Sequence, residues 1–444
     1  MAHITLREAA AWCGGSVAPE FENVTFVGAN MDSRKIEKEQ LFVALEGVRD
    51  GHEFIGSAME KGAAAVLCKH APAGIPAIIT EDPRIALGQI AAGLRQQLGM
   101  QVVGVTGSVG KSTTKEMIAA VLSGDYIVSK TPANFNNDLG MPMAILAMPE
   151  DTEVAVLEMG MSHFGEISYL THIAQPDAAV IINVGTMHME NLGSREGVLQ
   201  AKLEILEGLK ADGKAFFCGD NDMLWSVREK LGRSVTYFGA ENLACSVRAE
   251  DICLDDGVRF RVLTENAEFA VQLALEGRHY VADALAAVAV GLSFGVAPER
   301  IVQRLGVFQN MAGRQEMYDK KGFHIIQDCY NAGPESMAAA LTVLGKRSGR
   351  RIAVLGDMLE LGKVEVDAHR DVGRIAAQNA DAVLAFGPLS RYVAEGAGEI
   401  CRTYDDRETM AQALKAIAQP GDTLLFKGSH GMHMELVLER FLET

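Results

Sequence analysis

The chain has 444 residues, of which 48% are hydrophobic and 22% are charged, and its formal net charge is −17. This composition can bury the cores of about three domains, which excludes a disordered chain. The acidic balance disfavours a nucleic-acid partner, because nucleic-acid-binding proteins usually present a broad basic face. The most apolar stretch, residues 284–296, is shorter than the roughly 18 residues of a membrane helix. Seven cysteines without C-x-x-C spacing and the lack of a signal-peptide pattern predict a cytoplasmic protein with reduced thiols.

The first predicted unit, residues 1–99, is a small α/β domain. It begins with a helix over 6–13 and ends with an apolar helix over 85–98. Short apolar runs over 41–45 and 64–67 predict strands between these helices.

The second unit, residues 100–312, alternates strand and helix as a mainly parallel sheet with helical crossovers does. Its apolar strands include two that end at Glu158 and Asn183. Runs of β-type residues between 245 and 273 interrupt the alternation, and the Asp255-Asp256-Gly257 turn predicts an antiparallel hairpin there.

The third unit, residues 313–444, returns to the alternation. It has a predicted helix over 335–344 and predicted strands over 324–328, 351–355, 382–386 and 423–426. This pattern is typical of a Rossmann-like, doubly wound domain. The chain as a whole is therefore predicted to be an α/β protein of three domains.

A glycine-rich loop at residues 104–115 reads Gly-Val-Thr-Gly-Ser-Val-Gly-Lys-Ser-Thr-Thr-Lys. A strand over 101–105 leads into it, and a helix is predicted over 115–122. Small residues let backbone amides close around a polyphosphate, and the start of a helix adds positive potential. Lys111 is placed to reach the terminal phosphates, and the Ser112 hydroxyl is placed to ligate magnesium. The loop therefore predicts an ATP site.

Three side chains in the second unit are candidates for the chemistry beside this loop. Glu158 ends an apolar strand at the sheet edge that binds ligands, where a carboxylate next to a phosphate loop holds magnesium. His188 follows the strand over 179–183 at the same edge, although such a histidine alone is more often structural. Lys202 lies on a helix that begins near Arg195, and by itself it is expected to be a solvated lysine.

Three segments of the third unit could contact a ligand. The Arg314 guanidinium could hold a phosphate. Residues 328–334 end a strand with an acid, and a turn follows. Residues 427–431 end the last strand and are predicted to open the last helix, whose N-terminus would attract an anion. Each segment alone is equally compatible with ordinary turn chemistry.

Taken together in this order, the motifs resemble the Mur ligase family of peptidoglycan synthesis. Besides the segments above, the resemblance rests on Asp32-Ser33-Arg34, Asp50-Gly51-His52, Asn136-Asn137-Asp138-Leu139-Gly140, Gly277-Arg278-His279 and Gly356-Asp357-Met358-Leu359-Glu360-Leu361-Gly362. The last of these, with Tyr330-Asn331-Ala332, favours the branch that adds D-alanyl-D-alanine. The Asp-Asn-Pro-Arg motif of the diaminopimelate-adding branch is absent from the sequence.

The resemblance implies a role for each of these positions. The catalytic residues would be Lys111, Glu158, His188 and Lys202. Two magnesium ions would be held by Ser112, Glu158, His188 and Lys202, the lysine as a carbamate formed with carbon dioxide. ATP would be bound by Thr106, Gly107, Ser108, Gly110, Lys111, Ser112, Thr113, Asn137, His279, Asp283, Arg314 and Asp328. The substrates would be bound by Asp32, Ser33, Arg34, Asn331 and Lys427, the first three at the uridine nucleotide.

The sequence departs from the family pattern at three places. Tyr280 follows His279, and Asp283 stands where the family has an asparagine, so a carboxylate replaces an amide on the adenine side. Cys329 and Gly333 are substituted in the strand-end motif. His430 replaces the usual arginine, which weakens one expected anion contact in the third unit.

The family resemblance implies a monomeric ATP-dependent ligase without membrane insertion. It would join D-alanyl-D-alanine to UDP-N-acetylmuramoyl-tripeptide through an acyl phosphate. One alternative is a sister ligase that adds a single amino acid, and another is a nucleotide-dependent switch that ligates nothing. The sequence leaves open whether the third residue of the acceptor is lysine or diaminopimelate. It also leaves open whether the incoming unit is D-alanyl-D-lactate or D-alanyl-D-serine instead of D-alanyl-D-alanine.

Overall fold

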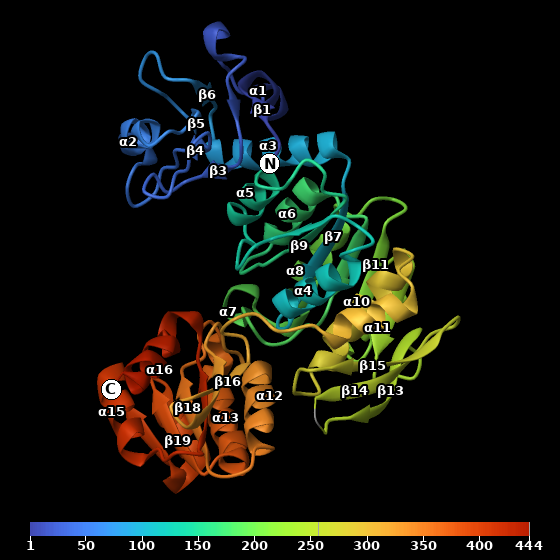
Figure 1. The fold of residues 1–444 in the computed structure, drawn as a ribbon, viewed down its shortest axis with the longest axis vertical. Coiled ribbons are helices and arrows are strands. Elements are labelled where there is room, and N and C mark those ends of the chain that lie inside the picture. Colours follow the sequence, from blue (N-terminus) through green and yellow to red (C-terminus); the bar gives the residue numbers. More distant parts are fainter. Residues whose placement is uncertain (256, 444) are drawn as a thin grey trace.

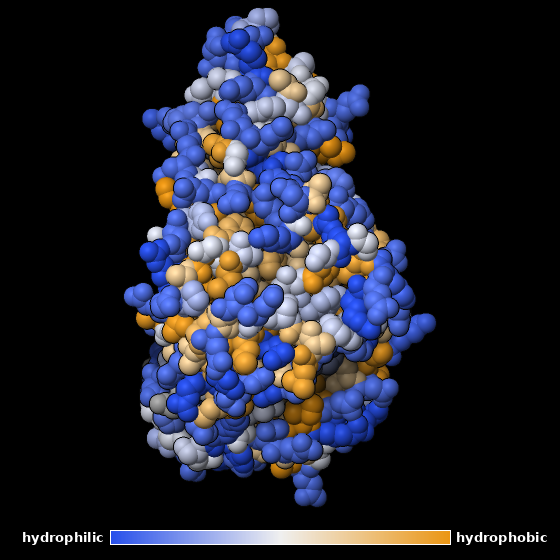
Figure 2. Space-filling model, turned by 90° about the vertical axis from the view of Figure 1, so that its right-hand side faces the viewer, coloured by the Kyte–Doolittle hydropathy of each residue, from blue (hydrophilic) through white to orange (hydrophobic). Residues whose placement is uncertain are grey.

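The structure is a computed structural model that describes residues 1–255 and 257–443. Figure 1 shows three α/β units, the first (blue) at the top, the second (green to yellow) in the middle and the third (orange to red) at the lower end. On the face seen in Figure 2, apolar side chains are scattered among polar ones, as on most globular proteins. In the part of the chain that is described, no helix has the length and apolarity to cross a membrane.

The first unit combines two small sheets with three α-helices and two 3-10 helices. Strands β1 and β2 pair antiparallel, and β3-β4-β5-β6 form a parallel sheet. The bounds of the strands are β1 Ile4–Thr5, β2 Thr25–Phe26, β3 Ala29–Asn30, β4 Leu41–Val43, β5 Ala65–Cys68 and β6 Ala77–Ile79. The helices are α1 Leu6–Cys13, η1 Pro19–Phe21, η2 Gly51–Phe54, α2 Ile55–Glu60 and α3 Pro83–Leu98.

The second unit is built on a sheet whose described strands run in the order β15-β14-β13-β12-β11-β10-β7-β9-β8. Its strands are β7 Gln101–Thr106, β8 Val128–Lys130, β9 Val154–Glu158, β10 Ala178–Ile181, β11 Lys214–Cys218, β12 Val235–Gly239, β13 Val247–Cys253, β14 Val258–Leu263 and β15 Glu268–Leu273. Strands β7 to β12 pair in parallel, which confirms the predicted parallel sheet. The predicted hairpin is confirmed as the antiparallel pair β13–β14, but Asp256 of its turn lies outside the described residues.

Helices cover this sheet, and their bounds are α4 Lys111–Leu122, α5 Gly140–Leu146, α6 Glu166–Ala174, α7 Met189–Leu192, α8 Arg195–Leu203, η3 Glu204–Leu206, α9 Asp222–Ser226, α10 Tyr280–Ser293 and α11 Pro298–Gly306. The predicted start of α4 at residue 115 is wrong. The helix begins at Lys111 because Gly110, at φ +83°, turns the loop directly into it. The prediction that a strand ends at Asn183 is also wrong, since β10 ends at Ile181.

The third unit has a sheet of order β16-β17-β21-β18-β19-β20, parallel except for β16. Its strands are β16 Glu316–Lys320, β17 Phe323–Asp328, β18 Arg351–Gly356, β19 Ala382–Phe386, β20 Cys401–Tyr404 and β21 Thr423–Lys427. Its helices are α12 Pro334–Gly345, η4 Gly362–Val364, α13 Glu365–Asn379, α14 Ser390–Ala397, η5 Gly398–Ile400, α15 Arg407–Ile417, η6 His430–Met432 and α16 Met434–Leu442. Strands β16 and β20 were not predicted, because these edge strands are only partly buried and lack an apolar run.

The hydrophobic core is continuous across the first two units and separate in the third. One cluster of buried side chains runs from Ile4 through α3 to the strands of the second unit. The third unit has its own clusters on the two faces of its sheet. The contacts of the third unit with the second, described below, include several polar side chains, which favours movement of the third unit as one body.

Candidate active site

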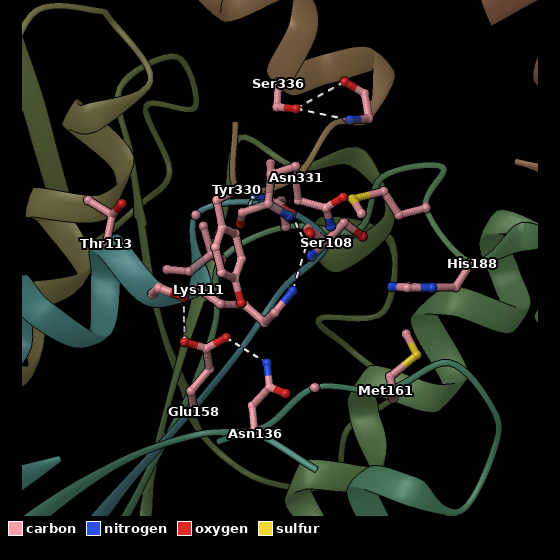
Figure 3. Close-up of a pocket in the computed structure, with 18 of the residues that line it drawn as sticks. Ser108, Lys111, Thr113, Asn136, Glu158, Met161, His188, Tyr330, Asn331 and Ser336 are labelled. Carbon is pink, nitrogen blue, oxygen red and sulfur yellow. Dashed lines mark hydrogen bonds between the residues drawn. The ribbon is translucent and has the colours of Figure 1, made fainter. Parts of the chain in front are cut away.

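A cavity of about 1150 Å³ lies between the second and third units. It is lined by residues at the C-terminal ends of β7, β9 and β10 and of β17 and β21, the edge at which open α/β sheets bind ligands. Figure 3 shows side chains of both units around it, with Lys111 and Glu158 from the second and Tyr330 and Ser336 from the third. Its volume is sufficient for a nucleotide.

The phosphate loop joins β7 to α4 at one wall of this cavity. The ammonium of Lys111 donates hydrogen bonds to the carbonyls of Gly107 (2.8 Å) and Ser108 (3.3 Å), so it lies against its own loop. Burial lowers the pKa of Lys111, and the nearby Glu158 carboxylate opposes this shift. The amides of the first turn of α4 have no partner within the helix, so the loop offers them to an anion.

Asn183, two residues beyond the end of the neighbouring strand β10, holds the phosphate loop. Its Oδ1 accepts hydrogen bonds from the amides of Ser108 and Val109, both at 2.9 Å. Its Nδ2 donates to the carbonyl of Val109 at 3.0 Å. The sequence analysis treated Asn183 only as a strand end, although a polar residue at the same sheet edge as the loop was a usable signal.

Ser112 and Glu158, each predicted from the sequence to hold magnesium, lie in direct contact. Ser112 Oγ donates to Glu158 Oε2 at 2.5 Å, and Glu158 is almost fully buried. Glu158 Oε1 accepts a hydrogen bond from Asn136 Nδ2 at 2.9 Å, a contact that the sequence analysis missed. A buried carboxylate beside a hydroxyl of the phosphate loop fits a magnesium ion, which prefers such oxygen ligands. The neighbouring Asn137 also lines the cavity, but its Oδ1 accepts from the amide of Gly140 at the start of α5.

Lys202 is buried, so the expectation of a solvated lysine is wrong. It lies on the face of α8 that carries the buried Val198 and Ala201, and only 2% of it is exposed. Burial lowers its pKa well below the usual value, and the charge of Lys111 lowers it further. Burial therefore disfavours the charged ammonium form of Lys202 relative to the neutral amine.

His188 lies at the start of α7 in the left-handed region, with φ of +63°. Figure 3 shows its imidazole extending from its loop towards the cavity. Its Nδ1 lies 2.7 Å from Glu360 Oε2 of the third unit, and the contact lowers the pKa of the Glu360 carboxyl. Among the described residues no three His, Cys, Asp or Glu side chains are already grouped around a metal position.

The third unit places Arg314 and Asp328 on the opposite wall. The Arg314 guanidinium stacks on the Tyr330 ring, 3.7 Å from its centroid. Asp328 Oδ2 accepts from the Lys427 ammonium at 2.6 Å, and the same ammonium donates to the Asn331 carbonyl at 2.9 Å. Lys427 is therefore a buried, paired cation rather than a free one.

The last helix does not open at residues 427–431, as the sequence analysis predicted. A short 3-10 turn occupies His430–Met432, and α16 begins at Met434. The reason is that His433 adopts the left-handed conformation at φ +48°, which interrupts a right-handed helix. The amides at the start of α16 therefore lie several residues beyond the predicted anion site.

Family models match most of the chain. The Mur ligase family catalytic domain matches residues 23–102, the Mur ligase middle domain 105–291, and the Mur ligase glutamate ligase domain 313–430. The Bacillus subtilis protein named UDP-N-acetylmuramoyl-tripeptide–D-alanyl-D-alanine ligase is 42% identical to this chain, over 99% of this chain and 98% of its own length. This chain belongs to the Mur ligase family. The Escherichia coli protein of the same name is 35% identical over 95% of each chain.

Solved structures of the family share the fold of this Mur ligase. MurF from Acinetobacter baumannii matches with a TM-score of 0.92 and 31% identity over 100% of both chains. MurF from Thermotoga maritima, solved in complex with ADP, matches with a TM-score of 0.84 and 30% identity, over 94% of this chain and 97% of that one. The family resemblance and the three-domain α/β architecture predicted from the sequence are confirmed.

The Asp283 departure of this Mur ligase has a physical consequence in the structure. Asp283 is buried on α10 and accepts a hydrogen bond from the Thr114 hydroxyl at 2.7 Å. Burial raises the pKa of Asp283 to about 7. A protonated carboxyl has an O–H donor, so near neutral pH this side chain partly recovers the donor that an asparagine would offer. The neighbouring His279 is exposed, and its ring lies 4.1 Å from that of Tyr280, centroid to centroid.

The residues expected at the uridine nucleotide lie apart from this cavity, in the first unit between β3 and β4. The Arg34 guanidinium donates from Nε and Nη2 to the two carboxylate oxygens of Asp32, both at 2.9 Å. These hydrogen bonds lower the pKa of Asp32 to about 2. Asn331, expected at the incoming substrate, is exposed at the cavity.

Proposed function

We propose that this Mur ligase uses ATP to join D-alanyl-D-alanine to UDP-N-acetylmuramoyl-tripeptide, forming the pentapeptide precursor of peptidoglycan. The observation that carries the proposal is its end-to-end similarity to ligases of that name. The phosphate loop, with the Ser112–Glu158 pair at its side, supplies the ATP chemistry that such a ligase needs. The ADP complex of a structural relative accords with this use of ATP.

The proposed ligation has two steps, the formation of an acyl phosphate and then of the peptide bond. The terminal carboxylate of the tripeptide attacks the γ-phosphate of ATP, which forms an acyl phosphate and releases ADP. The amine of D-alanyl-D-alanine then attacks the acyl carbon, loses a proton and expels inorganic phosphate as the peptide bond forms. Carboxylate and triphosphate repel each other, so Lys111 and the amides of the phosphate loop must stabilise the charge that accumulates between them.

Two magnesium ions are part of the proposal. Ser112 and Glu158 would hold one, and Glu158, His188 and Lys202 would hold the other. When bound, these ions neutralise charge on the transferring phosphoryl group. Lys202 fits this role because burial disfavours its cationic form, and the neutral amine can attack carbon dioxide and lose a proton, which leaves an anionic carbamate. The carbamate turns a cation into an oxygen ligand.

The substrate contacts follow the same arrangement. For ATP we propose the phosphate loop (Thr106, Gly107, Ser108, Gly110, Lys111, Ser112, Thr113), Asn137, His279, Asp283, Arg314 and Asp328. The stacked Arg314 would meet a phosphate and Asp328 the ribose. Asp32, Ser33 and Arg34 would hold the uridine nucleotide, and Asn331 with Lys427 would form part of the dipeptide site.

We further propose domains at 1–99 for the UDP-linked substrate, 100–312 for ATP, and 313–444 for the incoming dipeptide. The family models change close to both boundaries, between 102 and 105 and between 291 and 313. The third domain, whose core is separate, would close on the second to exclude water from the acyl phosphate. We propose that the protein is cytoplasmic, since its proposed substrates are nucleotide-linked, and that it acts as a monomer.

Phosphate release from ATP tests the function, with purified protein, UDP-linked muramoyl tripeptide and D-alanyl-D-alanine, each omitted in turn. We expect release only with all three, and a pentapeptide product by mass spectrometry. Release with a single amino acid and a shorter acceptor would indicate the sister ligase. ATP hydrolysis without any acceptor would indicate a nucleotide switch.

A further inference from the structure

A short loop of the second unit is held by carboxylates of the third. We call residues 185–190 the histidine loop, because His188 lies within it. Glu335 Oε1, in the first turn of α12, accepts from the amide (3.1 Å) and the hydroxyl (3.3 Å) of Thr186. Glu360 Oε2 lies 2.7 Å from His188 Nδ1. Of these two carboxylates, only Glu360 contacts a side chain that the proposed function places at a metal.

The contact between His188 and Glu360 joins two residues in unusual backbone conformations. Both lie in the left-handed region, His188 at φ +63° and Glu360 at φ +62°. Non-glycine residues adopt this region rarely, and such residues cluster at functional sites. Gly362 follows at φ +56°, and a Cβ there would lie 3.0 Å from the Cα of Glu190 in the histidine loop. The backbones of the two units therefore approach closely where the two side chains meet.

The two ring nitrogens of His188 can serve two different partners, the Glu360 carboxylate at Nδ1 and the proposed metal site at Nε2. Nδ1 is buried beside Glu360 and has no well-aligned hydrogen bond, although the carboxylate oxygen is within bonding distance. His188 also lines the cavity that holds the phosphate loop. Histidines that bind metals usually donate their other ring N–H to a carboxylate, which fixes the ring and raises its basicity.

We propose that Glu360 is a positioning residue for His188. Its carboxylate would accept a hydrogen bond from Nδ1–H and so orient the ring with Nε2 towards the magnesium site beside the phosphate loop. Because Glu360 belongs to the third unit, the metal site is complete only when that unit is docked on the second. The inference rests on the proposed role of His188 as a metal ligand.

The test is Mn²⁺ binding to the full chain with a non-hydrolysable ATP analogue, followed by electron paramagnetic resonance. We expect two Mn²⁺ sites of different affinity. Glu360→Gln should lower the Mn²⁺ affinity of the weaker site about tenfold or more, the usual effect of removing the hydrogen-bond partner of a metal-binding histidine. His188→Ala should weaken the same site, and the double variant should bind no worse than His188→Ala alone. Glu399→Gln, which removes an exposed carboxylate of the third unit, is the matched control. Thermal unfolding of each variant checks its fold.

Three results would overturn the proposal. If Glu360→Gln binds Mn²⁺ like the unmodified protein while His188→Ala does not, Glu360 has no part in the metal site. A raised KM for D-alanyl-D-alanine with unchanged Mn²⁺ affinity would instead place Glu360 at the ammonium of the incoming dipeptide. If His188→Ala also binds Mn²⁺ normally, the metal role of His188 fails. If the unmodified protein does not synthesise the pentapeptide, the proposed function is wrong, and this outcome is distinct from the three above.

Discussion

The two sides of the proposed metal region are built in different ways. Lys111 and Ser112 reach the cavity from one strand–loop–helix segment, and Glu158 ends the adjacent strand. On the other side, His188 comes from a loop, Lys202 from a helix and Glu360 from the third unit. The first side is shaped mainly by local backbone geometry, whereas the second requires distant segments to pack together. We therefore expect the first side to be fully formed before the third unit docks and the second side to depend on docking.

Replacing the phosphate-loop lysine gives the largest expected effect on the first side. Lys111→Ala should lower kcat by about a thousandfold or more, because a charge that stabilises the transferring phosphoryl group is lost. Phosphate release with all three substrates measures it. Lys230→Ala, at an exposed lysine, should retain normal activity. Near-normal turnover by Lys111→Ala would refute the assignment of the phosphate loop.

The corresponding change on the second side is Lys202→Ala. We expect about a hundredfold loss or more of ligation, and partial recovery with short carboxylic acids that supply the missing oxygen ligand. Lys202→Arg, which places a permanent cation at this position and cannot form a carbamate, should be inactive and should not recover. Full activity of Lys202→Ala would remove the carbamate from the mechanism.

Asp283, on α10, contacts Thr114 in the helix that follows the phosphate loop. Its titration therefore tests how much this long-range contact site contributes to the stability of the protein. In the folded protein the pKa of Asp283 is about 7, whereas a free aspartate has a pKa near 4. Unfolding therefore releases a proton from Asp283 when the pH lies between about 4 and about 7. The protein should therefore lose stability as pH rises from about 4 to about 7. Asp283→Asn removes this pH dependence. The free energy of unfolding of the variant minus that of the unmodified protein should therefore be about 2 kcal/mol larger at pH 7 than at pH 5. Unfolding measured at both pH values checks it, and an equal difference at the two would show an unshifted pKa.

The smallest effect is expected for the stacked arginine of the third unit. Arg314→Lys keeps the charge but loses the planar guanidinium that stacks on Tyr330. We expect the KM for ATP to rise about tenfold, with little change in the melting temperature. The matched control is Arg391→Lys, because Arg391 also stacks, on Tyr392 and away from the cavity. An unchanged KM for ATP would remove Arg314 from the nucleotide site.

The fold class could be predicted from the amino-acid pattern alone, and so could the candidate residues on the first side of the proposed metal region. Apolar runs separated by helical segments specify a parallel α/β sheet, and glycines followed by Lys111 and Ser112 specify a phosphate loop. Glu158 was identifiable because parallel strands bring their C-terminal ends to one edge. These features depend on neighbours in the chain or on one strand pairing, so a pattern in the sequence is enough to predict them.

The burial of Lys202 and the contacts between the two units depend on long-range packing, which local sequence patterns do not reveal. Nothing in the sequence around Lys202 shows that it is buried, because burial depends on which elements pack against α8. The pairing of Lys427 with Asp328 and the meeting of His188 with Glu360 each join side chains far apart in the chain. Such contacts depend on the relative positions of strands and units, which long-range packing sets and a local pattern does not encode.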